Sequence, residues 1–490
     1  MSKFIIKPIL FLGELAFFVS IIQNHKIYTM SKIKLIILVL GGLLIGNANV
    51  HAAKGPNTEP QNTQPGSSTV GEENPVSSET LEPARPVTRE ELEGVRSELA
   101  VVNDKLNYQL TNNIPSTTRS LQINGIFQNR YNDVTYSSNQ NTLPYSNGFV
   151  FNQVVLSFRG NLKRDYEEGR NVDYVVSFAA SGATSYNLQA TDVYLQYSIL
   201  QSLDIEKAYM YVQFGQQKIP FGLEPQVLEA FTPTVNLATF AGPGGFNLAA
   251  RDIGIQLRGD LFPSVDVGYN YRNPFIQYAF GVFNGSGQNA LDSNSEKDVV
   301  GRIVLNAPVD YNSIWRGLSL GTSIYSGEPT LASPTTGGVT QVGSKKRYGV
   351  DLAYVPVSNP IGITAEYVSG KSDSILSGNT LANEVIKTTY SSGSTVTLFY
   401  NFGEQFLKNY DNQSRHDDWW PTTYQPFVRF DHYNSDTSGA GTKTSVVTYG
   451  FNWFFAPTTK FQLNYNVSDI KTASTSSKNN QLQLQFQYGF

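Results

Sequence analysis

The ten residues that end the chain, QLQLQFQYGF at positions 481–490, alternate strictly between two kinds of side chain. One set consists of Leu482, Leu484, Phe486, Tyr488 and Phe490, and the other consists of four glutamines and a glycine. A β-strand sends successive side chains to opposite faces, so the pattern predicts a strand with one apolar and one polar face. A strand of a soluble sandwich would show the same alternation, so the rest of the chain must decide what each face contacts.

The same period of two recurs throughout residues 121–490, in about 16 segments. NQVVLSFRGNL (152–162) and RDIGIQLRGDL (251–261) are two clear examples. Most segments are close to the roughly 10 residues that a tilted membrane strand needs. The expected strand centres are residues 126, 155, 175, 194, 213, 256, 279, 303, 321, 351, 365, 397, 429, 449, 464 and 485.

The polar faces of these strands carry charges at their centres, on Arg159, Arg258, Arg302, Arg429 and Asp431. Burying such charges in a packed core would cost several kcal/mol each unless they were paired, whereas a water-filled lumen imposes no such cost. A soluble all-β chain of this size would also divide into domains, and no linker follows residue 120. We therefore predict an all-β fold, a 16-stranded antiparallel transmembrane β-barrel whose apolar face contacts lipid and whose glutamine face contacts water.

The connections between the expected strands differ in length. Tight ones occur at 356–362 and 456–460, and long polar ones occur at 222–250, 327–345, 370–392 and 403–424. Short turns at one rim and long loops at the other are typical of outer-membrane barrels, and an even strand number removes exposed edges. The glycine-rich FAGPGGFN (240–247) is expected to be a flexible loop tip, since no helix follows it to make a phosphate-binding loop.

The first 120 residues differ in composition from the barrel. Residues 1–53 contain an N-terminal extension and a signal peptide that starts at Met30, with a charged start, a short apolar run and a small-residue cleavage site, although a membrane anchor is the alternative. Residues 54–87 form a Pro/Ser-rich linker expected to be disordered. Within 88–118, apolar residues at 3–4 spacing predict a short coiled-coil helix, with one amphipathic helix lying on the main domain as the alternative.

Composition limits the chemistry of the 490-residue chain. It contains 28 Tyr, 29 Phe and 41 Gly, no Cys, only four His, and a net charge of −4. A disulfide framework or thiolate metal site is excluded, and we expect no metal, no cofactor and no nucleic-acid partner. Ser286 lies in an incomplete GxSxG motif, so catalysis is weakly supported, and His416 beside two aspartates is better explained as solvated charge than as a cation site.

Six cations are candidates for the pore lining: Arg159, Lys218, Arg251, Arg258, Arg302 and Arg429. Pores select ions by the sign and spacing of lining charges, so these residues could attract anions. The alternative is that each pairs with an acid of a neighbouring strand, such as Asp252, Asp260, Asp298 or Asp431, and serves structure instead.

Several stretches resemble the phosphate-selective porin O and P family: VQFGQQKIPFGLE (212–224), ARDIGIQLRGDL (250–261), YAFGVFNGSGQNALDSNSEKDVVGRIVLNAP (278–308) and FVRFDHYN (427–434). The resemblance covers residues 121–490 and implies a 16-stranded porin in the bacterial outer membrane. It also implies a homotrimer that passes anions such as phosphate, with Lys218, Arg251, Arg258 and Arg302 at motif positions. Unlike the best-known members, this chain has no Lys or Arg within 222–250.

Three functions remain open from the sequence. The first is a porin for passive diffusion of small hydrophilic solutes with a preference for anions. The second is a barrel adhesin or surface antigen that acts through its long loops. The third is a barrel enzyme, which the sequence supports least, so we expect no enzymatic activity.

Overall fold

The computed structural model describes residues 121–136, 147–163, 170–181, 187–200, 208–228, 231–266, 269, 271–332, 339–355, 359–375, 386–403, 423–439, 441–456 and 458–490. The expected signal peptide, linker and coiled-coil helix lie outside these residues, as does His416. None of the described residues forms a helix long and apolar enough to cross a membrane.

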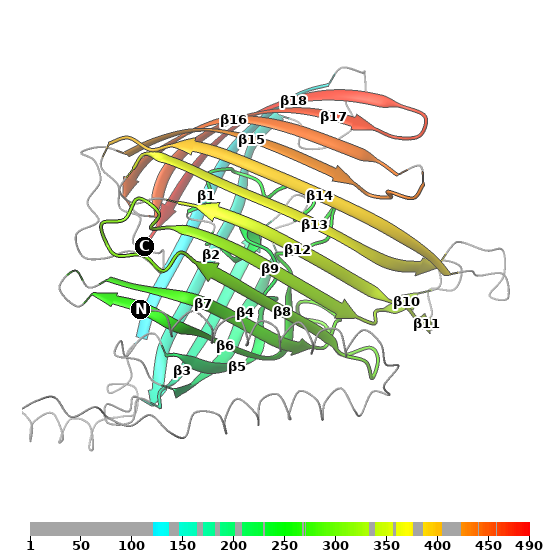
Figure 1. Cartoon of the computed structure of the whole chain (residues 1–490). Helices are drawn as coiled ribbons and strands as arrows, with labels where there is room; N and C mark the ends of the chain where they lie inside the picture. Colours follow the sequence, from blue (N-terminus) through cyan, green and yellow to red (C-terminus); the bar gives the residue numbers. More distant parts are fainter. Residues whose placement is uncertain are drawn as a thin grey trace, which may run out of the picture. The chain divides into compact units, whose positions relative to one another are not determined.

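Sixteen strands form one closed barrel, in which every hydrogen-bonded neighbour is antiparallel (Figure 1). The strand number predicted from the alternation is confirmed, and all 16 expected centres fall within strands. The barrel strands are β1 (Leu121–Tyr136), β2 (Asn147–Lys163), β3 (Val172–Ser181), β4 (Asn187–Leu200), β5 (Met210–Lys218), β6 (Arg251–Asp266), β7 (Tyr271–Phe283), β8 (Asp298–Asn306), β9 (Leu318–Gly327), β12 (Lys345–Tyr354), β13 (Ile361–Ile375), β14 (Ile386–Tyr400), β15 (Thr423–Asn434), β16 (Lys443–Ala456), β17 (Thr459–Lys471) and β18 (Ser476–Gly489).

Two short elements lie outside this ring of strands. A small hairpin, β10 (Thr330–Ala332) with β11 (Val339–Val342), forms its own two-stranded sheet between β9 and β12. A 3-10 helix, η1 (Glu224–Gln226), lies in the connection between β5 and β6.

The barrel closes where β18 pairs with β1. Backbone hydrogen bonds join Gly125 and Phe490 in both directions, at 2.9 and 3.0 Å. Gly125 leaves room for the terminal ring, because a Cβ there would lie 2.5 Å from the Phe490 ring, and that ring also stacks on Phe127 with centroids 5.9 Å apart. The C-terminal aromatic residue thus covers a glycine at the seam.

The two faces of β18 separate as the alternation predicts, but the polar face does not contact open water. Phe486, Tyr488 and Phe490 are exposed on the outer surface, whereas Gln483, Gln485 and Gln487 are at most 1% exposed. The expectation that the glutamine face lines open water is therefore wrong for these three residues. Side chains of neighbouring strands and an inward-folded segment of the chain cover them.

Antiparallel strand order assigns each connection to a rim. The connections 219–250, 328–344 and 376–385 share one rim, which we call the loop rim, and 355–360 and 457–458 lie at the opposite turn rim. The long connection at 403–424 joins β14 to β15 at the turn rim, so its expected placement among the long loops was wrong. Because long loops are extracellular in outer-membrane barrels, we assign the loop rim to the outside.

Candidate pore lining

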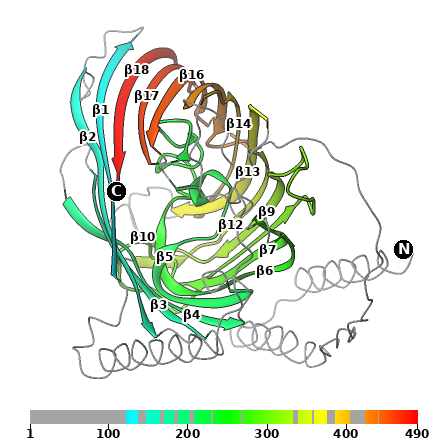
Figure 2. The ribbon, with the colours of Figure 1, turned by 90° about the vertical axis from the view of Figure 1, so that its left-hand side faces the viewer.

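The connection between β5 and β6, residues 219–250, folds into the barrel rather than outward (Figure 2). Phe221, Phe240 and Phe246 are at most 6% exposed and form an apolar cluster with strand residues such as Val368 and Tyr433. The prediction of a flexible loop tip at 240–247 is therefore wrong. We call residues 219–250 the inward loop.

Gly245 permits tight packing within the inward loop. A Cβ on Gly245 would collide with the backbone of Phe240, whose carbonyl accepts a hydrogen bond from Phe246 N at 2.6 Å. Apolar residues therefore pack inside the lumen, a position that alternation cannot indicate because the loop has no period.

One part of the inward loop, residues 232–237, lies along the wall formed by β15–β18 and β1. Lys460 donates to the Thr232 carbonyl at 2.6 Å, Gln462 donates to the Pro233 carbonyl at 3.1 Å, and Asn452 donates to the same carbonyl at 2.8 Å. Lys460 is 0% exposed and forms an ion pair with no carboxylate among the described residues. Its amino group is held by a backbone carbonyl of the inward loop.

Arg130 on β1 holds the same segment from the other side. Its guanidinium donates to the Val235 carbonyl at 3.4 Å, to the Asn236 side chain at 3.1 Å and to Gln485. The Asn236 amide donates in turn to Gln483 at 2.9 Å. These contacts cover the glutamines of β18 with loop backbone.

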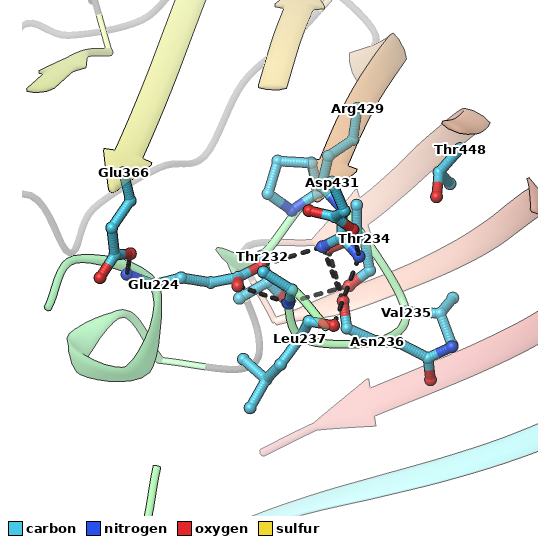
Figure 3. Close-up of polar contacts among 12 residues, drawn as sticks. Glu224, Thr232, Thr234, Val235, Asn236, Leu237, Glu366, Arg429, Asp431 and Thr448 are labelled. Atoms are coloured by element: carbon cyan, nitrogen blue, oxygen red, sulfur yellow. Dashed lines mark hydrogen bonds and ion pairs between the residues drawn. The ribbon is translucent and has the colours of Figure 1, made fainter. Parts of the chain in front are cut away.

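Arg429 on β15 lies at the centre of the contacts with the inward loop (Figure 3). It forms ion pairs with Asp431 at 2.8 Å on its own strand and with Glu224 at 3.0 Å on η1. It also donates to the Asn236 and Leu237 carbonyls. Arg429 is 4% exposed, so its charge is neutralised and buried between wall and loop.

Glu224 connects the inward loop to two walls. Its carboxylate accepts from Ala238 N at 2.7 Å as well as from Arg429, and its own backbone N–H donates to Glu366 on β13 at 3.1 Å. Burial raises the pKa of the Glu224 carboxyl, an effect that the nearby Arg429 opposes. The carboxyl groups of Glu224 and Glu366 therefore fix the start of the inward loop between β13 and β15.

Two more of the predicted pore-lining cations are paired with acids. Arg302 makes a two-fold contact with Asp351 across β9, at 2.5 and 2.9 Å, and both residues are buried. Arg251 pairs with Asp192 on β4 at 3.0 Å. Lys218 donates to the Pro225 carbonyl of η1 at 3.1 Å. For Arg251, Arg302 and Arg429 the structure supports the alternative of pairing with an acid, although the partners differ from most of those expected.

Arg159 and Arg258 differ from the other predicted pore-lining arginines in their contacts. Arg159 on β2 is exposed and Arg258 on β6 donates to Gln256 and to Gln226, and neither forms an ion pair with a described carboxylate. Their strand neighbours Phe158 and Leu257 have the opposite parity, which places the two arginines on the lumen side.

The model of the family described as phosphate-selective porin O and P matches residues 121–490 of the chain. The chain belongs to this family. It is therefore an outer-membrane porin, a channel through which small hydrophilic solutes diffuse passively. No curated protein matches the sequence.

Solved structures resemble the porin at low sequence identity. OmpF of Salmonella typhi, solved with daunomycin, aligns with a TM-score of 0.50 and 10% identity over 75% of this chain and 97% of its own, which shows a common fold. The outer membrane channel DcaP of Acinetobacter baumannii aligns with a TM-score of 0.49 and 13% identity, over 76% of this chain and 97% of its own. An anion-selective porin from Comamonas acidovorans aligns with a TM-score of 0.49 and 11% identity, over 76% of this chain and 100% of its own.

Sequence reasoning missed two cations of the porin that hold the inward loop, Arg130 and Lys460. Both share the polar parity of their strands, since Arg130 alternates with Phe127 and Tyr131 across β1, and Lys460 precedes Phe461. That parity was available in the sequence, but the carbonyl partners were not. The described residues contain no group of three or more acidic or histidine side chains that could hold a metal ion, and Ser286 contacts only Ser293 among the hydrogen bonds described.

Proposed function

We propose that the porin prefers anions such as phosphate, and that Arg159 and Arg258 carry this preference. The observation behind the proposal is that these two lumen-side guanidinium groups have no carboxylate partner among the described residues. The other arginines predicted to line the pore, Arg251, Arg302 and Arg429, are neutralised by acids. A channel selects ions by its uncompensated lining charges, so the β2–β6 wall should set the sign of selectivity.

The inward loop supports a moderate rather than a strong preference. It supplies no lysine or arginine between 222 and 250, and Glu224 within it is neutralised by Arg429. A unit charge acting across about 4 Å of water contributes about 1 kcal/mol, or about fivefold in relative permeability. Two such charges favour anions in general, so phosphate and chloride would compete for passage through the channel.

Planar-bilayer recording tests this proposal. In a salt gradient, the wild-type channel should show a reversal potential of the anion-selective sign. The double variant Arg159→Gln/Arg258→Gln should bring the potential close to zero without loss of conductance steps. The matched control is Lys471→Gln, which removes a cation from the outward parity of β17, where it pairs with Asp469 at 3.0 Å, and should change nothing. A cation-selective wild type, or a double variant with unchanged selectivity, contradicts the proposal.

We also propose that the porin is a homotrimer and that residues 88–118 form a periplasmic coiled coil. The 3–4 spacing of apolar residues in that segment supports self-association, and the termini of the barrel sequence lie at the turn rim. Chemical cross-linking of the porin in detergent should trap trimers, and deletion of 88–118 should reduce their yield. Monomers alone in the full-length chain contradict the proposal.

A further inference from the structure

Strand β12 begins with three consecutive cations whose side chains divide between the two faces of the barrel. Lys345 lies 3.7 Å from Asp298, and the Arg347 guanidinium lies over the Phe246 ring of the inward loop, so both point into the lumen. Lys346 lies between them and shares the parity of Tyr348, which is 53% exposed on the outer surface. Lys346 therefore projects away from the pore.

The strand register places a second lysine directly opposite the first. Lys346 of β12 pairs with Lys371 of β13, and the row continues to Tyr390 of β14. Side chains in directly opposite positions lie about 4.5–5.5 Å apart at Cβ, and like charges there repel each other. Neither lysine forms an ion pair with a described residue. Asp373, two residues beyond Lys371 on β13, accepts hydrogen bonds from Ser344 N and the Thr388 hydroxyl.

The depth of the pair is marked by tyrosines. Tyr348 follows Lys346 by two residues on β12, Tyr390 is opposite Lys371 on β14, and each is about half exposed on the outer surface. Toward the turn rim the same face is apolar, with Val350 and Leu352 on β12. Tyrosines concentrate at the level of lipid head groups, so the lysine pair lies at the boundary between hydrocarbon and water. The pair is near the loop rim, which we assigned to the outside.

We propose that Lys346 and Lys371, flanked by Tyr390, bind the phosphate of an anionic lipid in the outer leaflet. A phosphate group between the two ammonium groups would remove their repulsion and accept a hydrogen bond from each. Lysine side chains at this depth can bury their methylene stems against tyrosine rings while the ammonium reaches the head group. The surface is separate from the pore and does not depend on the ion preference proposed above.

A second lysine pair provides a matched control. Lys443 of β16 is opposite Lys471 of β17 on the same outer face. This pair lies two alternate positions beyond the last apolar outward residues, Val447 and Val467, and Lys471 already pairs with Asp469 at 3.0 Å. It also places two lysines opposite each other, but one of them is paired with an acid and no tyrosine of the neighbouring strand positions flanks them.

Native mass spectrometry of the detergent-solubilised porin tests the proposal, with a diphosphorylated glucosamine lipid as the anionic probe and phosphatidylcholine as the neutral one. The wild type should retain the anionic lipid. The Lys346→Gln/Lys371→Gln variant should lose affinity by about fivefold for each lysine, and the Lys443→Gln/Lys471→Gln variant should keep it. Equal binding by the wild type and the first variant overturns the proposal, as does an equal loss in both variants.

Two further measurements test whether the charge of the lysines is what matters and whether the ligand is a lipid rather than free phosphate. The Lys346→Arg/Lys371→Arg variant keeps the charges and should retain the lipid. Inorganic phosphate added in excess should not displace it; displacement would mean that the surface takes free phosphate and would overturn the lipid assignment. If the glutamine variant does not fold, the wild type alone decides, because a phosphate–lysine contact must weaken as salt is raised, and binding that is insensitive to salt overturns the proposal.

Discussion

Two walls of the lumen carry arginines of the same parity and use them differently. On the wall of β15–β18 and β1, Arg429, Arg130 and Lys460 all contact the inward loop, and each donates to at least one of its backbone carbonyls. On the wall of β2–β6, Arg251 pairs with Asp192, whereas Arg159 and Arg258 have no acid partner among the described residues. The residue type and strand parity are the same, so the role of each cation is decided by what packs against it.

The difference is the basis for proposing a moderate rather than a strong anion preference in a barrel with many lumen-side cations. Charges that hold the loop are desolvated and unavailable to a passing ion, and an acid also neutralises Arg429. On the other wall, Arg159 is exposed, and Arg258 donates to Gln226 of the inward loop but has no described acid to neutralise it. The inward loop thus narrows the lumen and also determines which charges a solute meets.

The largest expected effect comes from removing Arg429. Arg429→Met leaves the buried Asp431 carboxylate without its cation and removes the ion-pair partner of Glu224, which should lower the free energy of unfolding by about 3–5 kcal/mol. The measurement is urea unfolding of the folded barrel in lipid vesicles. Lys460→Met is the control, because Lys460 has no acid partner among the described residues, and its loss should cost about 1 kcal/mol or less. Equal losses in the two variants would show that the ion pairs do not distinguish these sites.

Replacing residues 232–247 by a short glycine–serine linker should enlarge the channel. We expect single-channel conductance to rise by about two- to fourfold, and anion preference to increase because Arg130, Arg429 and Lys460 then contact water. The control is deletion of the β10–β11 hairpin, which belongs to the same rim but forms a separate sheet, and should leave conductance unchanged. An unchanged conductance after replacement of the loop would mean that the inward loop does not limit ion flow.

Much of the fold could be predicted because its signal is local. Alternation at period two is present in every strand, so strand number and the pairing of the last strand with the first followed from the sequence. The inward folding of residues 219–250 could not be predicted in the same way. Glu224 and Arg429 are 205 residues apart, and no periodicity links a loop to the wall that receives it.

Weaker signals of the inward loop were nevertheless present in the sequence. A loop in water rarely contains Phe231, Phe240 and Phe246 with no lysine or arginine, and this composition is better explained by burial. The contacts of the β18 glutamines were also unpredictable, because they are made by residues far away in the sequence. Their polarity predicted the lumen face correctly, but whether water or a loop covers that face depends on distant residues.

The two walls should also respond differently to charge reversal. Arg258→Glu should shift the reversal potential toward cation selectivity, by about fivefold or more in the permeability ratio, since it replaces an uncompensated positive charge with a negative one. The exchanged pair Arg302→Asp/Asp351→Arg keeps the lumen charge and both ends of the buried ion pair, so selectivity should remain that of the wild type. A shift of similar size in both proteins would contradict the distinction between paired and unpaired arginines.

The smallest expected effect concerns Glu224, which connects the inward loop to the covered wall. Burial raises the pKa of this carboxyl, so the folded porin holds its proton at a pH where the unfolded chain has lost it. The stabilising contribution is therefore complete below the unfolded pKa and falls as pH rises through the raised value. Glu224→Gln mimics the protonated side chain and leaves Arg429 its ion pair with Asp431 at 2.8 Å.

Urea unfolding midpoints of the wild type and of Glu224→Gln, measured from acid to neutral pH, show whether ionisation of Glu224 destabilises the porin. The variant and the wild type should be equally stable in acid, and the wild type should become the less stable of the two as the pH approaches neutrality. The opposite order at neutral pH would mean that the ion pair between Glu224 and Arg429 outweighs the cost of burying the carboxylate. In that case the ion pair would stabilise the loop-covered wall at neutral pH, and Glu224 would belong with Arg429 among the residues whose loss costs most.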